Sequence, residues 1–478
     1  MAENMLLLFV IFLPLLGGFF VLYAKDNEKQ PANNAVHTAL LTVFVNILLI
    51  FGLFSFVGME TTGKQLQYSC QFLSFIRFSF GADMLTLLFT LGCQMAVLVG
   101  ILSLKYEKQN QKNILFYALL YLSFLNGYFF ALDIMSFFIF FTVQLYPLYM
   151  LIGLSLPQNR HQNLVRLCVH HFFGAALLCA GCVFILSLKQ NDILLSHIDK
   201  LHLSYSKSIM VWGGLFFALI LRVPIWPFHH ALTSVWPALK NPLSFIALHI
   251  LPLTGIYGFM RCWPLNIPFE ISVLSPVFQT LCVITMVFVA LGEYANFGAK
   301  HKLSNYVFVY DLIYLLAVFL PTDIIWFNIA YSVFSFLLIA SCLVVIEFCV
   351  LQESIKANTN ARGGLCKMPR ALLLYSLFIL AAAQLPVSAF FSNNFVIVSK
   401  IFNYHLYMGI VVVLCMTLAA VSLLRGFYVL HDENCATAPS KVQIQDLDIS
   451  TFIMIMLFMA VLFISLIKPL WFVFEKGL

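Results

Sequence analysis

Long apolar runs alternate with short polar segments along the whole chain. The runs cover residues 5–24, 36–58, 82–104, 112–131, 133–155, 164–188, 210–229, 242–261, 272–292, 304–320, 324–350, 371–402, 404–430 and 449–474. A helix needs about 20 consecutive apolar residues to cross the hydrocarbon core of a bilayer. The pattern therefore predicts an all-α polytopic membrane protein with about 14 transmembrane helices, formed as a single membrane domain over 1–478.

The composition agrees with this class and narrows the chemistry. Hydrophobic residues make up 62% of the 478 positions and charged residues only 10%, proportions that exclude a soluble domain of this length. The chain has no glycine-rich phosphate loop or nucleophile motif, and its CxxC pair, Cys179 and Cys182, lies inside an apolar run. We therefore expect no catalytic residues, no metal site and no cofactor bound by this chain, and no nucleic-acid partner.

The positive charges are distributed unevenly between the two sides of the predicted bundle. Of the 26 Lys and Arg residues, nine fall on the side of the termini, sixteen on the opposite side, and Arg222 falls inside a span. Lysine and arginine are enriched in cytoplasmic loops of membrane proteins. The sequence therefore predicts that both termini lie outside and that the sixteen-cation loops are cytoplasmic.

The segment Leu221–Arg261 interrupts this regularity. It carries the intramembrane cation Arg222, followed closely by Pro224 and Pro227. Proline removes a backbone donor and clashes with the preceding turn, so we expect the seventh helix to break within the membrane. Broken backbone is tolerated there only where protein or water covers it, and an intramembrane charge beside such a break is typical of transport proteins.

A weak similarity between two short segments of the chain indicates an internal repeat. Pro224–Phe228 and Pro386–Phe390 both read P-x-x-x-F after an aliphatic residue, and they lie five spans apart. Paired proline interruptions in two halves indicate a transporter fold built from repeats. We therefore predict broken helices 7 and 12.

At this point the sequence resembles a known family. The stretches PLYMLIG (147–153), RVPIWPFH (222–229), YGFMR (257–261) and GGLCKMP (363–369) resemble the antiporter-like membrane subunits of respiratory complex I, the proton-translocating NADH:quinone oxidoreductase. The likeness is greatest to the group of bacterial subunit M and mitochondrial subunit 4. The resemblance implies two inverted five-helix repeats, with helices 4–8 over 112–261 and helices 9–13 over 272–430. Helices 1–3 then cover 1–111, and a last helix covers 449–478.

The resemblance also implies a line of titratable side chains across the membrane, and much of this line is absent here. Counted from the shared motifs, the glutamate of the fifth span falls on Thr142, the lysine of the eighth on Leu253 and the acid of the twelfth on Asn394. The lysine before the seventh-span prolines is matched by Arg222, which stays charged at any working pH and so cannot shuttle a proton. A histidine of the tenth span falls near Asp311.

The remaining proton-path candidates are Arg222, Asp311, His229, His249 and Lys400, and each has a structural alternative. Arg222 would pair with Asp311 or with carbonyls freed by the prolines. His229, with His230 beside it, would lie at an interface, and His249 would be an ordinary core histidine. Lys400 would extend to the interface.

Two further carboxylates have simpler interpretations. Asp133 stands at the start of a span, where a helix N-terminus favours a carboxylate. Glu347 would face the cytoplasmic interface.

The predicted function is that of a membrane-arm subunit of a proton-translocating NADH:quinone oxidoreductase, supporting proton translocation with its own relay degraded. It would be at most a non-redox subunit, with NADH, flavin, iron–sulfur clusters and quinone held by partner subunits. The expected location is a bacterial inner membrane rather than an organelle, among other membrane-arm subunits and lipid. The alternatives are a non-pumping structural paralogue and a cation/proton antiporter-type module of another transporter.

The charge distribution generates a topological prediction. Cysteines introduced into the 105–112 and 356–370 loops should react with impermeant thiol reagents only from the cytoplasmic face, because these loops carry the excess of cations. Labelling of Lys108→Cys from the outer face of intact cells would contradict the orientation.

Overall fold

The computed structural model describes residues 2–24, 33–57, 66–73, 76–104, 110–157, 161–187, 205–262, 275–295, 299–320, 325–356, 364–386, 388–431 and 445–475. The first half contains α1 (Ala2–Tyr23), α2 (Asn33–Phe54), β1 (Leu66–Leu73), β2 (Ile76–Ala82), α3 (Met84–Ser103), α4 (Gln111–Phe130), α5 (Ile134–Val143), α6 (Leu145–Ser155), α7 (His161–Ser187), α8 (Tyr205–Ile220), α9 (His230–Thr233), the short 3-10 helix η4 (Trp236–Ala238) and α10 (Pro242–Cys262). The second half contains α12 (Ser275–Ala295), α13 (Ala299–Val318), α14 (Ile325–Lys356), η5 (Leu365–Lys367), α15 (Pro369–Ala382), α16 (Ala389–Tyr404), α17 (Leu406–His431) and α19 (Ile449–Glu475).

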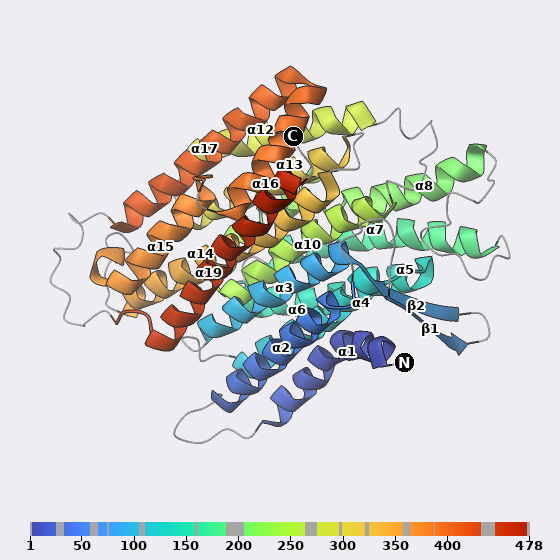
Figure 1. The fold of residues 1–478 in the computed structure, drawn as a ribbon, viewed down its shortest axis with the longest axis horizontal. Coiled ribbons are helices and arrows are strands. Elements are labelled where there is room, and N and C mark those ends of the chain that lie inside the picture. The colour runs from blue at the N-terminus through green and yellow to red at the C-terminus, as the bar shows by residue number, and fades with distance from the viewer. Residues whose placement is uncertain are drawn as a thin grey trace.

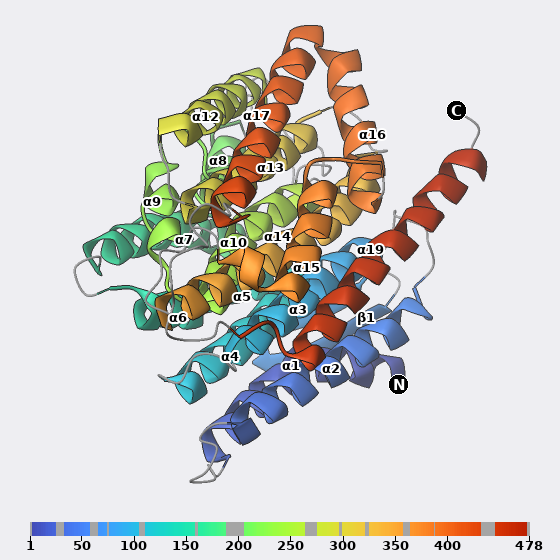
Figure 2. The ribbon, with the colours of Figure 1, turned by 90° about the vertical axis from the view of Figure 1, so that its left-hand side faces the viewer.

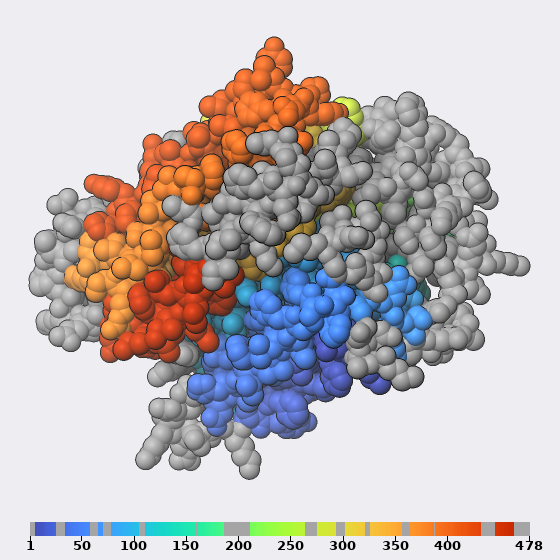
Figure 3. Space-filling model, in the orientation of Figure 1, coloured from blue at the N-terminus to red at the C-terminus, as the bar shows by residue number. Residues whose placement is uncertain are grey.

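The long helices run side by side in one bundle, as Figure 1 shows. The start of α1, the end of α19 and the β1–β2 hairpin lie at the same end of the bundle (Figures 1 and 2). Most of α3 and the apolar stretches of α10 and α14 are buried within the chain, so these helices form the centre. The first helices and α16–α17 lie at opposite edges of the face seen in Figure 3.

The polytopic prediction is confirmed. Ten helices in the described ranges are long and apolar enough to cross a bilayer, and the shorter apolar helices include Val211–Ile220, Pro369–Ala382 and Ile449–Leu462. The count of fourteen spans, the two inverted repeats and their boundaries remain predictions. Large apolar side chains such as Phe20, Phe173 and Tyr407 are exposed on the outer helices, where a membrane protein faces lipid or partner subunits.

The predicted interruption of the seventh span is present between α8 and α9. Pro224 has no N–H to bond the carbonyl of Ile220, and the N–H of Val223 bonds that carbonyl instead, closing the helix. The carbonyl of Leu221 then accepts a hydrogen bond from His170 of α7 (3.1 Å). The N–H of Trp226 donates to Thr285 of α12 (2.9 Å). Side chains of two other helices therefore satisfy the opened backbone.

The interruption of the twelfth span lies between α15 and α16 and follows the same logic. Pro386 cannot donate to the carbonyl of Ala382, and the hydroxyl of Tyr306 donates to it (3.1 Å). Gln384 adopts a left-handed conformation with φ 62°, and its amide group donates to the hydroxyl of Tyr310 (3.1 Å). Two tyrosines of α13 therefore form hydrogen bonds with Ala382 and Gln384, next to the interruption at Pro386.

Two local features differ from the sequence prediction. The span predicted as a single helix over 133–155 turns at Gln144 into α5 and α6, because Pro147 has no N–H for the carbonyl of Val143. Residues 66–82, predicted only as a loop, form an antiparallel hairpin. The pattern of apolar runs does not indicate this hairpin, because its strands are short and mixed in polarity.

Close packing of α10 against the end of α8 depends on two glycines. A Cβ at Gly255 would come within 2.9 Å of the Leu219 carbonyl and of the Arg222 Cβ. A Cβ at Gly258 would come within 2.7 Å of the Tyr128 hydroxyl and clash with the Leu219 side chain. These glycines bring α10 close enough to hold the polar groups at the break in the seventh span.

Candidate functional site

Arg222 lies directly after α8, at the break, and is 1% exposed. One guanidinium nitrogen donates to the backbone carbonyl of Phe141 in α5, and another donates to the hydroxyl of Thr254 in α10 (3.3 Å). The guanidinium carbon stacks 3.7 Å from the centroid of the Phe141 ring, an arrangement that gains cation–π energy. Arg222 thus joins α5, α8 and α10.

The suggested pairing of Arg222 with Asp311 is wrong. Among the described residues, Arg261 forms an ion pair with Asp83 and Asp311 lies within 4.0 Å of His249, whereas no carboxylate is found within that distance of Arg222. The alternative, that Arg222 binds a carbonyl, is correct in kind, although the carbonyl belongs to Phe141 rather than to the break itself. A buried cation is costly unless polar groups replace its lost water. For Arg222 these groups are a carbonyl, a hydroxyl and the face of an aromatic ring.

His249 and Asp311 form the second polar site. His249 Nε2 of α10 and Asp311 Oδ1 of α13 are 3.8 Å apart, and their side chains are 2% and 0% exposed. No hydrogen bond from another described residue reaches either carboxylate oxygen or His249 Nε2. The ring of His249 is enclosed by those of Trp236 and Phe336. His249 is therefore not an ordinary, fully hydrogen-bonded core histidine.

A chain of neutral polar groups lies beside Asp311. One turn further along α13, the hydroxyl of Tyr314 is 3.0 Å from that of Ser332 on α14. The hydroxyl of Ser332 donates to the side-chain carbonyl of Asn394 on α16 (2.5 Å). Asn394 thus keeps a hydrogen bond at a position where the family resemblance implies an acid.

The other two positions at which the family resemblance implies a titratable group, Thr142 and Leu253, are neutral as well. The hydroxyl of Thr142 donates to the carbonyls of Phe138 and Ile139. These hydrogen bonds lie within its own helix. Leu253 is buried and apolar. The residue after it, Thr254, accepts a hydrogen bond from Arg222.

The remaining sequence candidates lie apart from both sites. His229 is half-buried at the start of α9 and exposed His230 follows it. Lys400 is half-buried near the end of α16, six residues beyond Asn394. The structure therefore brings together His249 with Asp311, and leaves His229 and Lys400 outside the contacts that these two and Arg222 make.

His171 is a buried polar residue that the sequence analysis missed. It lies on α7, is 1% exposed, and its Nδ1 is 2.8 Å from the hydroxyl of Tyr149. The adjacent His170–His171 pair inside an otherwise apolar run was the signal in the sequence that pointed here.

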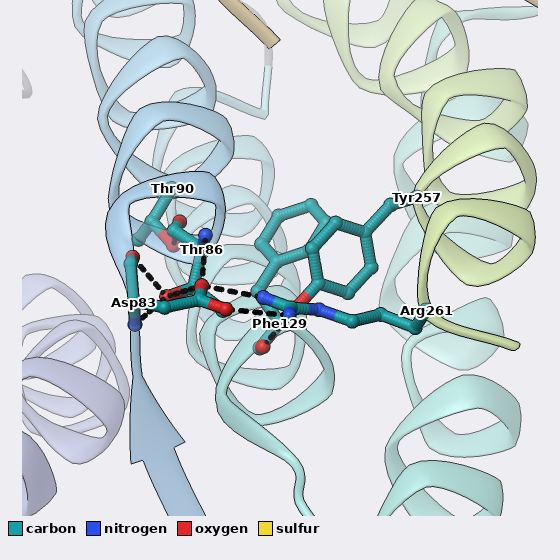
Figure 4. Close-up of polar contacts among 6 residues, drawn as sticks. All are labelled: Asp83, Thr86, Thr90, Phe129, Tyr257 and Arg261. Carbon is teal, nitrogen blue, oxygen red and sulfur yellow. Dashed lines mark hydrogen bonds and ion pairs between the residues drawn. The ribbon is translucent and has the colours of Figure 1, made fainter. Parts of the chain in front are cut away.

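An ion pair at the end of the bundle that holds the termini was also missed. Arg261, in the last turn of α10, makes a bidentate contact with Asp83 at distances of 2.5 Å. Its Nε donates to the hydroxyl of Tyr257 (2.8 Å), which donates in turn to the carbonyl of Phe129. Figure 4 shows this cluster between α3, α4 and α10. Arg261 is one of the nine cations counted in loops on the side of the termini, but it lies within α10 and its side chain is only 15% exposed.

Asp83 also caps a helix, and Asp133 does the same for another helix. Asp83 caps α3 by accepting the backbone N–H of Thr86 (2.9 Å). Asp133 caps α5 by accepting the N–H of Ser136 (2.7 Å) and also that of Ser79 in the hairpin (2.7 Å). Burial raises the pKa of the Asp133 carboxyl, and the hydrogen bonds from Ser136 and Ser79 oppose that shift. The expected helix-start role of Asp133 is confirmed.

Two other charges were misplaced by the sequence analysis. Glu347 of α14 does not simply face an interface: it is 5% exposed and accepts a hydrogen bond from Tyr375 of α15 (2.7 Å). Lys302, counted with the loop cations, is 7% exposed within α13. Lys302 and Arg261 belong to opposite sides of the charge count, so the excess of cations on one side is unchanged.

Comparisons with known proteins agree with this architecture. The family described as "NADH:quinone oxidoreductase/Mrp antiporter, TM" matches residues 131–422. The chain is 25% identical over 435 residues to NADH-quinone oxidoreductase subunit M of Rickettsia bellii, covering 89% of this chain and 87% of that protein. It is 23% identical over 409 residues to NADH-ubiquinone oxidoreductase chain 4 of Mycosarcoma maydis, covering 83% of each. A chain of respiratory complex I from Thermus thermophilus has the same fold, with a TM-score of 0.82, 19% identity and coverage of 98% and 96%.

The Asp83–Arg261 pair should stabilise the fold more than an unpaired capping aspartate does. Asp83→Asn keeps a capping side chain but leaves Arg261 buried without a counter-charge, which should cost about 3 kcal/mol. Asp133→Asn is the matched control, because within the described ranges no cation lies within 4.0 Å of Asp133, and it should cost about 1 kcal/mol. Thermal midpoints of the purified assembly measure both.

A double-mutant cycle isolates the ion pair from the cap. Asp83→Asn combined with Arg261→Met should destabilise the protein by less than the sum of the single changes, because the second change removes the uncompensated cation. Additive effects, with Asp83→Asn no worse than Asp133→Asn, would contradict the role of the pair.

Proposed function

The chain belongs to the NADH:quinone oxidoreductase/Mrp antiporter transmembrane family, and on that premise we propose that it is a membrane-arm subunit of a proton-translocating NADH:quinone oxidoreductase. The observation that carries the proposal is the match of 89% of this chain to a protein named NADH-quinone oxidoreductase subunit M, and the broken helices at Pro224 and Pro386 support it. The proposed partners are the other membrane-arm subunits and the lipid of a bacterial inner membrane, with both termini outside.

We further propose that this subunit does not carry protons along a continuous line of its own. Its buried ionisable groups form separate sites: Arg222 contacts a carbonyl and a hydroxyl, whereas Asp311 lies beside His249. A proton relay needs groups that can change protonation, spaced closely enough for transfer through side chains or water. Thr142, Leu253 and Asn394 supply no such group, and Arg222 is fixed as a cation.

The electrostatics of Arg222 support a structural role for this residue. A pumping site requires a charge whose partner can be removed and restored, and a carboxylate beside a lysine provides this. Arg222 instead interacts with groups of fixed protonation, chiefly the Phe141 carbonyl and the Thr254 hydroxyl. We propose that Arg222 holds the break in the seventh span closed.

The cofactors of the reaction belong to partner subunits in this proposal. NADH, flavin, iron–sulfur clusters and quinone would carry the electrons elsewhere in the complex, and this chain would contribute helices and packing surface. The non-pumping structural paralogue is the second candidate, and the separation of the two ionic sites favours it as a mechanism. It differs from the first candidate in whether the assembly around the chain oxidises NADH.

Copurification tests the assignment to a complex. The full-length chain with an affinity tag, extracted in mild detergent from its native membrane, should bring down subunits of an NADH:quinone oxidoreductase together with NADH-oxidising activity. Recovery of the chain alone, or with a complex that lacks this activity, would overturn the proposed function. Mass spectrometry and an NADH oxidation assay of the same eluate give both readings.

Two substitutions test whether this subunit carries protons along a continuous line of its own. Arg222→Met and Asp311→Asn should lower the yield of assembled complex while the number of protons pumped per electron stays at the native value. Removing the donor to a buried carbonyl costs about 1–3 kcal/mol, so assembly should be the affected quantity. Arg166→Met, a change of the same type at an exposed position of α7, is the control.

The opposite outcome is equally clear. If Arg222→Met or Asp311→Asn abolishes proton pumping while assembly and electron transfer persist, then the substituted group takes part in translocation and the non-pumping interpretation is wrong.

A further inference from the structure

Helix α1 carries a proline inside its membrane span. Pro14 lies at the middle of the apolar stretch Met5–Tyr23, and it has no N–H for the carbonyl of Val10. That carbonyl accepts two hydrogen bonds from side chains of other helices. One comes from Nδ2 of Asn46 in α2 (3.1 Å), and the other comes from Nδ2 of Asn126 in α4 (2.8 Å). Two side-chain amides therefore satisfy the backbone group that Pro14 leaves free.

A third amide joins the first two. Gln94 of α3 donates from Nε2 to Oδ1 of Asn126 (3.2 Å). Asn46, Gln94 and Asn126 are all 0% exposed, and we call these three residues the amide cluster. Together with the carbonyl of Val10 they join α1, α2, α3 and α4, which pack against one another (Figure 2). The first four helices of the chain therefore meet at one polar point inside the membrane span.

The orientation of each amide in the cluster is set by its neighbours. A carbonyl oxygen can only accept hydrogen bonds, and it has two lone pairs. Asn46 and Asn126 must therefore turn their NH2 groups towards Val10, whose carbonyl accepts both. Asn126 then presents its oxygen to Gln94, which must turn its own NH2 group towards it. Rotating any of the three amide planes by 180° would break these hydrogen bonds.

This arrangement leaves two side-chain oxygens that still need a donor. Oδ1 of Asn46 and Oε1 of Gln94 are buried, and neither accepts a hydrogen bond from the described residues. An amide oxygen without a donor is costly in an apolar environment. Because both residues are fully enclosed by this chain, a side chain of a partner subunit cannot reach them. A small group that has two hydrogens to donate would satisfy both oxygens, and water is such a group.

We propose that the amide cluster is a binding site for one buried water molecule, which donates one hydrogen to Oδ1 of Asn46 and the other to Oε1 of Gln94. The water then joins α2 to α3, in addition to the direct hydrogen bonds that Val10 and Asn126 make. A cation does not suit this site, because the NH2 groups turned into the cluster carry positive partial charge.

The site would fix the first two helices to the bundle from the inside. The outer sides of α1 and α2 are apolar and exposed, as at Phe9 and Phe44, and contact with lipid is as favourable for such side chains as contact with another helix. Hydrogen bonds between helices therefore contribute to the position of α1 and α2 in a way that apolar packing alone does not. The proposal concerns the first four helices and does not depend on the proposed function.

A density map of the assembled complex tests the site directly. Electron cryomicroscopy of the full chain in its native assembly, at a resolution that shows ordered water, should reveal one peak within about 3 Å of both Asn46 Oδ1 and Gln94 Oε1. A map without a peak at this position, or one in which protein groups donate to both oxygens, would overturn the proposal. This measurement uses the unaltered protein, so it does not depend on whether a variant folds.

Removing one acceptor should remove the water. Gln94→Met keeps a long side chain but has no oxygen, so the peak beside Asn46 should be absent from the map of this variant. Thr90→Val is the matched control, because Thr90 is buried four residues earlier on α3 and its hydroxyl donates to the carbonyl of Thr86 in the same helix. The peak should persist in the control. A peak that keeps its place in Gln94→Met would contradict a site shared by the two oxygens.

A double-mutant cycle measures the connection between α2 and α3. Asn46→Leu and Gln94→Met should each shorten the half-life of the heated complex about threefold, the size expected for one hydrogen bond between membrane helices. The double variant should lose less than the product of the two effects, because either change alone already removes the water. Asn46→Leu with Thr90→Val is the control cycle, in which the effects should multiply.

Effects of Asn46→Leu and Gln94→Met that also multiply would refute the connection through water. The map and the half-lives are measured on whichever assembly contains the chain. The subunits and the NADH-oxidising activity recovered with it test the proposed function separately.

Discussion

The arrangement of this chain follows from one constraint: a backbone polar group inside a membrane must find a partner within the protein. Proline breaks this rule locally wherever it stands in a span, and other helices restore it. His170 binds the carbonyl of Leu221 at the seventh-span break, and Tyr306 binds the carbonyl freed by Pro386. Each break therefore fixes which helices must lie beside it, and the bundle is assembled around these contacts.

Helix α10 is where these requirements meet. Along its buried length His249 lies beside Asp311, Thr254 accepts a hydrogen bond from Arg222, and Arg261 binds Asp83. Close approach at Gly255 and Gly258 allows the contacts to α8. The three polar contacts are about 7.5 and 10.5 Å apart along the helix axis, at a rise of 1.5 Å per residue. They are separate sites on one scaffold, and their separation is why the proposed function is structural at Arg222.

The candidate residues could be found in the sequence, but their partners could not. An arginine or aspartate inside an apolar run is conspicuous, so Arg222 and Asp311 were evident at once. Their partners depend on which helices are neighbours. For Arg222, both Asp311 and a backbone carbonyl fitted the sequence equally well. For His249, a proton-path role and an ordinary core position both fitted the sequence, because a single histidine carries no periodic signal. Arg261 was mistaken for a loop cation because it stands at the end of a run, where the partner Asp83 is 178 positions away.

The sequence by itself determined the class of the protein, the approximate position of its helices and the two proline breaks, because apolar length and the missing N–H of proline act locally. It also showed that Thr142 and Asn394 carry no titratable group, since residue identity requires no coordinates. Only the tertiary structure decided that Arg222 binds a carbonyl, that His249 lies beside Asp311, and that Arg261 pairs with Asp83. These contacts join residues distant in the chain, and they follow from the packing of helices, which no single apolar run specifies.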